Sequence, residues 1–325
     1  MRLVTFAASG AARLGALVDG DSRIVDFTAA RDDAGPAFQS MQMLIEGGDA
    51  ALNRAGEIVA GAQRSGRGVI EAASVKLLAP LPQPPQMRDF LCFEKHLIQA
   101  FTRLRKVQAA AAPDPEKALR ELEKQGGFNP PKIWYERPSF YKPSRFAVCG
   151  TDTDVTWPAY SKTIDYELEF ACVIGTPGRD IPKDKARAHI FGYTIFNDLS
   201  ARDEQSLEML SNLGPGKGKD FDCSNPIGPC IVTADEIPDP YALEMVVRVN
   251  GEERGRGNSR EMHWKYEDCI AFVSRDETIY PGEMFCSGTV GNGSGLEIGR
   301  YVEPGEIIEL EVEKIGVLRN RVLRV

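Results

Sequence analysis

Two glutamates inside an apolar run are the strongest sign of chemistry in this sequence. Glu167 and Glu169 stand two residues apart in the strand-like segment from Ile164 to Gly175. On a strand, alternate side chains share a face, so the two carboxylates start about 6–7 Å apart along the chain. Like charges on a mostly buried face repel each other and lose solvation, and a divalent cation relieves both effects. The pattern predicts a site for Mg²⁺, Ca²⁺ or Mn²⁺; the alternative is a strand face exposed to water.

Asp198 is a third candidate carboxylate, because it follows directly after the apolar run 190–197. A strand end holds a side chain firmly while the loop after it stays open to a ligand. The alternative role is the N-cap of a helix that we expect to begin near Ala201, and Ser200 suits that role equally well. Asp198 is therefore available for a functional site.

His96 has more suggestive neighbours than the other two histidines, because Asp89 lies close before it in the sequence. A histidine acts as a general base near neutral pH when a carboxylate orients it. A lone histidine is more often structural, so both interpretations stay open at this point.

The composition is that of a globular protein with an acidic balance. The 325 residues include 39 Lys and Arg against 47 Asp and Glu, a formal net charge of −8, and 42% are hydrophobic. These proportions exclude an intrinsically disordered chain. The acidic balance argues against nucleic acid as a partner, and no apolar run approaches the roughly 18 residues that a membrane helix needs. The missing signal-peptide features and the seven cysteines without a CxxC pair indicate reduced thiols in a cytoplasmic protein.

The expected elements divide the chain into a small N-terminal α+β domain over residues 1–76 and a catalytic domain over 77–325. Four prolines between residues 80 and 85 mark the junction, because they cannot continue a helix or a central strand. From residue 139 onward short apolar strands dominate, and the pattern predicts one more at Leu296–Ile298. The fold class is therefore α+β with more strand than helix.

The segment 101–137 is the least sheet-like part of the catalytic domain. It contains a charged helix candidate, Pro115–Glu123, with Asp114 as its expected cap. A lid over the site and a plain surface excursion are both compatible with this pattern.

Several segments, taken together, resemble the core of the fumarylacetoacetate hydrolase family. Their order and spacing agree with that family from about Asp89 to Val325. The resemblance implies the family's own β-rich mixed roll or sandwich fold, a homodimer, and a divalent metal, commonly Mg²⁺, Mn²⁺ or Ca²⁺. The segments are DYELEFACVIGTPGRDIPKDKARAHIFGYTIFNDLSARDEQ (165–205), GPGKGKDFD (214–222), SNPIGPCIVT (224–233), PGEMFCSGTVGNGSGLEIG (281–299) and VEPGEIIELEVEKIGVLRNRV (302–322).

The resemblance also implies roles for individual side chains. His96, oriented by Glu297, would be the general base in a His–Glu dyad. The metal ligands would be Asp89, Glu167, Glu169 and Asp198; the groups that stabilise the oxyanion and leaving group would be Arg202, Gln205 and Lys219; and the substrate contacts would be Tyr141, Thr289 and Arg105, with Arg103 as a rival for the last.

The main expectation from the resemblance is a metal-dependent hydrolase with a role in aromatic catabolism. It would cleave a C–C bond in a 1,3-diketo acid such as fumarylacetoacetate, fumarylpyruvate or another acylpyruvate, using water activated by His96 and Glu297. The alternative is an oxaloacetate decarboxylase or tautomerase, or a dienoate hydratase or isomerase, with the same metal site. A non-catalytic binding protein fits less well, because it has no need of a general base beside a metal.

Overall fold

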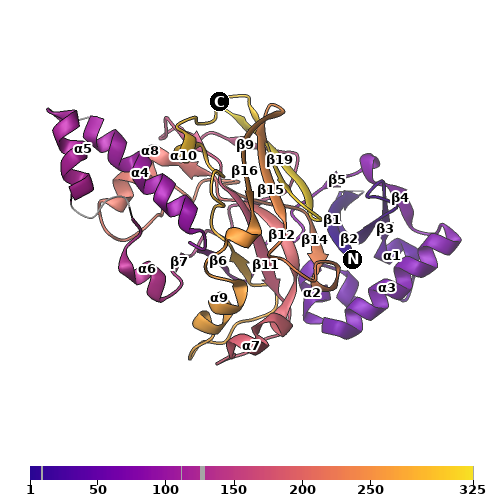
Figure 1. Cartoon of the computed structure of the whole chain (residues 1–325). Helices are drawn as coiled ribbons and strands as arrows, with labels where there is room; N and C mark the ends of the chain where they lie inside the picture. Colours follow the sequence, from indigo (N-terminus) through magenta and orange to yellow (C-terminus); the bar gives the residue numbers. More distant parts are fainter. Residues whose placement is uncertain (9, 111, 125–128, 325) are drawn as a thin grey trace.

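The computed structural model describes residues 1–325 apart from 9, 111, 125–128 and 325. More of the described residues lie in strands than in α-helices, which confirms the predicted strand-dominated class. The two main sheets face each other (Figure 1). A short third ladder joins β10 (Ile164–Asp165) to β13 (Ser200–Ala201).

The larger sheet has twelve strands within the described residues. Its order is β4-β3-β2-β1-β14-β12-β11-β17-β6-β7, with β5 paired to β1 and β8 paired to β14. The strands are β1 (Arg2–Ala8), β2 (Ala11–Val18), β3 (Arg23–Asp26), β4 (Val69–Glu71), β5 (Lys76–Leu77), β6 (Met87–Phe90), β7 (Phe140–Tyr141), β8 (Val148–Cys149), β11 (Leu168–Ile174), β12 (Ile190–Asn197), β14 (Asn225–Thr233) and β17 (Met284–Cys286).

The centre of this sheet explains where the acidic side chains lie. Strands β11 and β12 are buried along their whole length, as their nearly continuous apolar sequences require. They pair antiparallel with Glu169 opposite Phe196. On the other side of β11 lies β17, which runs parallel to β6 with Cys286 opposite Asp89. These registers bring Asp89 and the end of β12 close to Glu169.

The second sheet covers one face of the first. Its order is β16 (Glu252–Asn258), β15 (Glu244–Val249), β18 (Ile307–Val312), β19 (Gly316–Leu323) and β9 (Thr153–Thr156). Alternate residues of β18 are buried, as expected for a strand with one face toward the core. Leu310 and Met245 from this sheet share one hydrophobic core with Phe170 and Tyr193 from the larger sheet.

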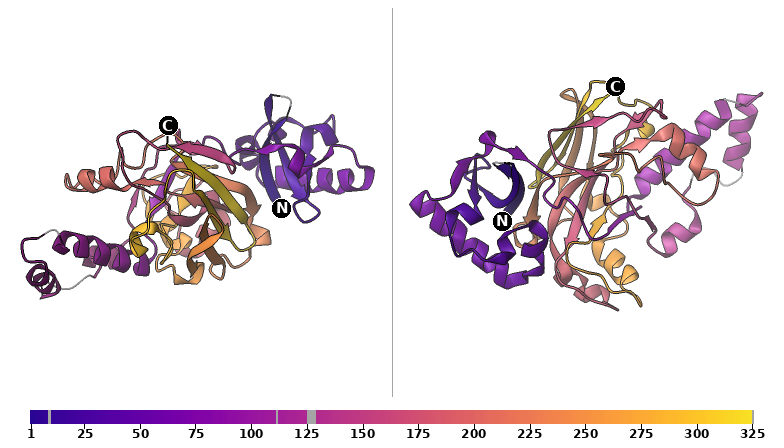
Figure 2. Two further views of the ribbon diagram at one scale, coloured as in Figure 1. Left: turned by 90° about the horizontal axis from the view of Figure 1, so that it is seen from above. Right: turned by 180° about the vertical axis from the view of Figure 1, so that it is seen from behind.

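The N-terminal strands form a curled unit with three helices, α1 (Phe27–Ala30), α2 (Met41–Glu46) and α3 (Gly48–Ser65). Both views in Figure 2 show this unit at one side of the molecule. Strand β1 nevertheless pairs antiparallel with β14, with Arg2 opposite Val232. The larger sheet is therefore continuous across the expected junction, and the domain boundary at residue 76 stays a prediction.

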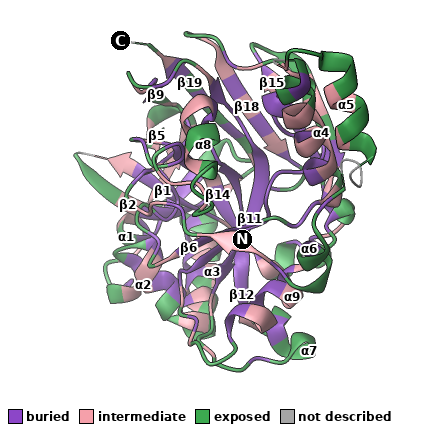
Figure 3. Ribbon diagram, turned by 90° about the vertical axis from the view of Figure 1, so that its left-hand side faces the viewer, coloured by how far each residue is buried: buried purple, intermediate pink, exposed green. Residues whose placement is uncertain are grey.

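The excursion after β6 forms α4 (Glu94–Ala110), α5 (Pro115–Lys124) and α6 (Lys132–Glu136). In Figure 1 α4 and α5 project at the end opposite the N-terminal unit. Helix α5 has no buried residue and is largely exposed in Figure 3, whereas the first turn of α4 buries His96. Asp114 Oδ1 accepts a hydrogen bond from the backbone N–H of Lys117 at 3.0 Å, which confirms the predicted cap. A lid over the site stays a prediction for this segment.

Two local predictions were wrong. Leu296–Ile298 is not a strand but part of the short helix α10 (Gly295–Ile298), because Ser294 and Glu297 form a capping box that begins a helix there. Helix α8 (Arg202–Met209) begins after Ala201 without a side-chain cap, and the Ser200 hydroxyl instead bonds the Asp198 carbonyl at 3.0 Å. The remaining helices are α7 (Lys183–Ala186) and α9 (Tyr266–Val273).

All seven cysteines carry free thiols. Among the described residues, no helix combines the length and apolar character needed to cross a membrane.

Candidate active site

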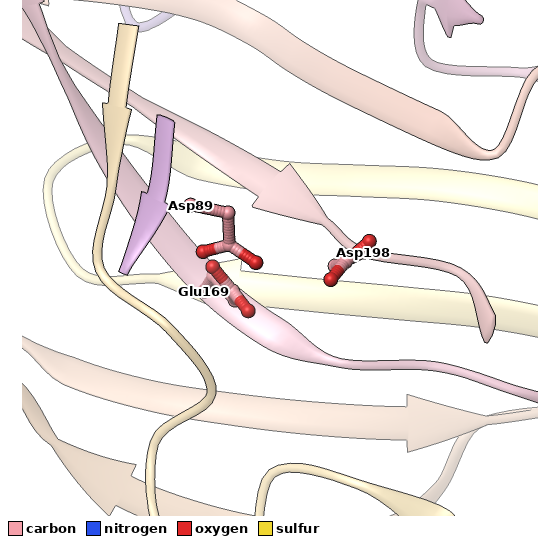
Figure 4. A group of neighbouring side chains, drawn as sticks. All are labelled: Asp89, Glu169 and Asp198. Atoms are coloured by element: carbon pink, nitrogen blue, oxygen red, sulfur yellow. The ribbon is translucent and has the colours of Figure 1, made fainter. Parts of the chain in front are cut away.

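Three buried carboxylates meet where the central strands of the larger sheet end. Asp89 comes from β6, Glu169 from β11, and Asp198 directly follows β12 (Figure 4). One carboxylate oxygen from each lies within 4.8 Å of those of the other two. Their exposed fractions are only 6%, 0% and 1%, respectively. Asp89 Oδ1 is also buried without a hydrogen-bond partner among the described residues.

The electrostatics of this acidic cluster of Asp89, Glu169 and Asp198 favour a cation. Burial raises the pKa of Asp89 well above its usual range, and the charge of Asp198 adds to the effect. Burial likewise raises the pKa of Glu169, with further contributions from the charges of Asp89 and Asp198. Oxygen-only ligands in this arrangement suit a hard divalent cation, which would replace the lost solvation and offset the repulsion. The cluster thus fits the metal that the sequence predicts.

Glu167 does not join this cluster, although the sequence predicts it as a fourth metal ligand. Glu167 stands one position before β11. Its carboxylate forms ion pairs with Arg202 at 2.8 Å and Lys219 at 2.6 Å. Burial alone would raise the pKa of Glu167, but the charges of Arg202 and Lys219 outweigh burial and lower it. The role of Glu167 as a metal ligand therefore stays a prediction.

His96 and Glu297 lie together as the resemblance implies, with 3.1 Å between Nδ1 and Oε1. Burial would lower the pKa of His96, but the charge and hydrogen bond of Glu297 outweigh it and raise the pKa overall. When Nδ1 carries the proton toward Glu297, Nε2 is left as a proton acceptor, and it lies 4.0 Å from Glu167 Oε1. The backbone N–H groups of Asn292 and Ser294 hold the Glu297 carboxylate in place.

Two buried cations stand between these groups. Lys219 Nζ donates to Glu167 Oε2 at 2.6 Å and to Asp198 Oδ2 at 2.5 Å. The Arg202 guanidinium pairs with Glu167 and donates to Gln205 Oε1 at 3.0 Å. Burial lowers the pKa of Lys219, but its two acidic neighbours outweigh burial and raise it. All five residues predicted as catalytic therefore belong to one connected set around the acidic cluster.

Two of the three predicted substrate contacts touch the acidic cluster. The Tyr141 hydroxyl donates to Asp198 Oδ1 at 2.8 Å, and the Thr289 hydroxyl lies 3.4 Å from Glu169 Oε1. Arg105 lies on α4, half-buried, and its role in substrate binding stays a prediction. Its rival Arg103 packs against Gly299, at the end of α10.

Sequence reasoning missed the connecting role of Asp165. This buried carboxylate bonds Arg202 Nε at 2.8 Å and accepts the backbone N–H groups of Gly295 and Leu296 at 2.8 and 2.9 Å. It therefore ties Arg202 to the helix that carries Glu297. The only signal in the sequence was its place at the head of the DYELE run.

The chain belongs to the fumarylacetoacetate hydrolase family. Residues 109–323 match the model described as the fumarylacetoacetate (FAA) hydrolase C-terminal domain. That range contains Glu169, Asp198, Lys219 and Glu297, whereas Asp89 and His96 lie before it.

The relatives include several mitochondrial oxaloacetate tautomerases. The human enzyme FAHD2A is 40% identical over 187 residues, which cover 55% of this chain and 58% of that protein. This chain thus matches little more than half the length of the human relative. A Xenopus laevis oxaloacetate tautomerase is 29% identical over 330 residues, which cover 99% of this chain and 90% of that protein.

Solved structures share the fold over the whole chain. A fumarylacetoacetate hydrolase from Exiguobacterium antarcticum is 26% identical with a TM-score of 0.73, and the match covers 100% of both chains. A maleylpyruvate hydrolase from Sphingobium sp. SYK-6, in complex with manganese(II) and pyruvate, is 24% identical with a TM-score of 0.71 and covers 100% of this chain and 99% of its own.

Proposed function

We propose that this protein is a divalent-metal-dependent enzyme that interconverts the keto and enol forms of oxaloacetate or a closely similar 2-oxo dicarboxylate. The observation that carries the proposal is the acidic cluster, linked through Lys219 and Glu167 to the His96–Glu297 dyad. The similarity of the chain to oxaloacetate tautomerases supports oxaloacetate as the substrate over the 1,3-diketo acids of the main sequence-based expectation.

The residues present fit a metal of the Mg²⁺ or Mn²⁺ type. Asp89, Glu169 and Asp198 would hold it, because they are buried, mutually repelling oxygen ligands. A bound divalent cation would act as a Lewis acid toward the oxygens of a 2-oxo acid. The Sphingobium structure, which shares the fold, is a complex with manganese(II) and with pyruvate, a 2-oxo acid.

The residues of the chain account for the proton transfer. Tautomerisation moves one proton from the carbon next to the ketone to the ketone oxygen, with no net gain or loss of atoms. In this proposal His96 Nε2 accepts the carbon-bound proton while Nδ1–H stays bonded to Glu297. His96 then returns the proton to the oxygen. Lys219 and Arg202, which are held beside Asp198 and Glu167, would supply positive charge to the ketone oxygen as it becomes negative.

A C–C hydrolase is the second candidate, and the same dyad favours it. A histidine oriented by Glu297 can equally take a proton from water, and the hydroxide would then attack a distal carbonyl. The similarity to the Exiguobacterium hydrolase also supports this reaction class. A role in aromatic catabolism belongs with this candidate, and it stays a prediction together with the homodimer.

Product analysis separates the candidates. Purified protein would be given oxaloacetate, acetylpyruvate, fumarylpyruvate and fumarylacetoacetate, each with Mg²⁺, with Mn²⁺ and with EDTA. The proposal expects metal-dependent acceleration of the keto–enol change of oxaloacetate, with no more pyruvate or carbon dioxide released than the metal releases without protein. Pyruvate formed from oxaloacetate faster than with the metal alone would indicate a decarboxylase instead, and acid products from a diketo acid would indicate the hydrolase.

A further inference from the structure

The loop that delivers Lys219 to the site is rich in glycine. Residues 214–219 read Gly-Pro-Gly-Lys-Gly-Lys, and Gly214 has a positive φ of 107°. Glycine has the largest conformational freedom in the unfolded chain, so such a loop needs external contacts to hold one shape. Lys219 itself is only 2% exposed and its ammonium lies between two carboxylates of the site. The position of this charge therefore depends on what fixes the loop.

A single carboxylate binds three successive backbone N–H groups of this loop. Glu208 Oε2 accepts from Gly216 at 3.0 Å and from Gly218 at 2.9 Å, and Glu208 Oε1 accepts from Lys217. Burial would raise the pKa of Glu208, but these three hydrogen bonds outweigh it and lower the pKa. Glu208 is therefore ionised at neutral pH, and each of the three bonds is charge-assisted.

The loop also packs tightly on the helix that carries Glu208. A Cβ at Gly218 would lie 2.7 Å from the backbone nitrogen of Gln205 and 2.8 Å from its Cα, so no larger residue fits. The Gly218 carbonyl accepts the backbone N–H of Ala201 at 2.8 Å, just before α8 begins. The loop is thus held near both ends of α8, by Glu208 in its last turn and by Ala201 just before its first residue. Arg202 and Gln205 reach the site from the same helix.

We propose that Glu208 is a positioning residue, which fixes the glycine loop so that the ammonium of Lys219 stands between Glu167 and Asp198. This inference rests on the proposed function only for its kinetic consequence. Its structural consequence, the burial of Lys219, is independent of which reaction the site performs.

The test compares Glu208→Gln with Glu204→Gln, which removes the same charge from the same helix. Gln retains one acceptor oxygen, but its NH₂ group meets a backbone donor, so the three-fold contact is lost. We expect kcat to fall by about 10- to 100-fold in Glu208→Gln, since a misplacement of ~1 Å can cost about 10². KM should change much less, and Glu204→Gln should match the wild type. Glu208→Asp keeps the charge and should recover part of the lost kcat.

A readout without catalysis accompanies the kinetics. Amine acetylation followed by mass spectrometry compares Lys219 with the exposed Lys217 of the same loop as the internal standard. We expect Lys219 to be protected in the wild type and in Glu204→Gln, and labelled several-fold faster in Glu208→Gln at unchanged Tm. Unchanged labelling and unchanged kcat in Glu208→Gln would overturn the inference. Faster labelling in a protein that is inactive on every substrate tested supports the inference and counts against the proposed function alone.

Discussion

The Nδ1 atom of His96 lies 3.1 Å from Oε1 of Glu297, although 201 positions separate the two residues in the chain. The pair joins the first turn of α4 to the capping box of α10. Replacing His96 with Ala should lower kcat by about 10²–10⁴, the usual contribution of a general base. Replacement of the half-buried His189, whose Nδ1 bonds the Thr176 carbonyl away from the acidic cluster, provides the control. Steady-state kinetics decide the matter, and a His96→Ala enzyme with wild-type turnover would remove the dyad from the mechanism.

Glu297→Gln should move the acid limb of the pH profile. Glu297 raises the pKa of His96 in the wild type, so the neutral base is lost as the pH falls through this raised pKa. Without the negative charge, His96 stays neutral to lower pH, and the limb of kcat/KM shifts toward acid while kcat itself decreases. Gln still serves the capping box of α10. A limb that stays in place, or moves toward alkaline pH, would show that His96 does not set it.

Glu169→Gln should stabilise the protein in EDTA while it abolishes metal-dependent activity. The pKa of Glu169 is raised in the fold, so its contribution to stability is present below the usual glutamate pKa and is lost as the pH rises through the raised value. Gln does not titrate and can still accept the backbone N–H of Gly288. In thermal unfolding, its Tm should exceed the wild-type Tm at about pH 8 and approach it toward pH 5. A lower Tm than wild type in EDTA at the higher pH would falsify this electrostatic account.

Metal binding should reverse the order of the two Tm values, so that the wild type becomes more stable than Glu169→Gln. Mn²⁺ should raise the Tm of the wild type and leave Glu169→Gln nearly unchanged, because ligand binding stabilises only the form that binds. The pKa of Asp89 is also raised, so binding must release protons and should weaken as the pH falls. Calorimetry in buffers of different ionisation enthalpy measures this release directly. Binding without proton release would contradict the raised pKa values.

Asp165→Asn should destabilise the protein more than an ordinary polar replacement. The Asp165 carboxylate is fully buried and pairs with Arg202, and an amide there would turn an NH₂ group toward backbone donors. Removing one partner of a buried ion pair costs about 3–5 kcal/mol. Urea unfolding measures the loss of stability in Asp165→Asn. Asp154→Asn, at an exposed position on β9, is the control. Equal midpoints for both variants would argue against a structural bridge at Asp165.

The residue pattern alone indicated Glu169 and Asp198 as candidate metal ligands, whereas Asp89 as a ligand and Glu297 as the partner of His96 were implied only by the resemblance to the family. The sequence could not show which way the Glu167 carboxylate turns. That depends on competition between a metal and two cations, Arg202 and Lys219, which come from later segments of the chain. The alternation rule placed Glu167 with Glu169 on one face. The residue lies outside β11, however, where that rule does not apply.

Two features of the fold were not anticipated, the first because of a local signal and the second because of long-range pairing. The apolar residues of Leu296–Ile298 favoured a strand, but the capping box of Ser294 and Glu297 decided for a helix. The continuous sheet from β1 to β14 rests on pairing between residues more than 200 positions apart, such as Leu3 and Ile231, and no local pattern carries that information.

The central claim is that the acidic cluster and His96 catalyse a metal-dependent keto–enol change of oxaloacetate. The most direct measurement follows the enol absorbance of oxaloacetate in Mn²⁺ buffer, for the wild type, His96→Ala and Glu169→Gln, with pyruvate assayed in parallel. The account predicts that only the wild type reaches equilibrium faster than the buffer with metal alone, and that EDTA removes this acceleration. Wild-type protein that does not exceed the metal blank, or that accumulates pyruvate in step with the absorbance change, would contradict it.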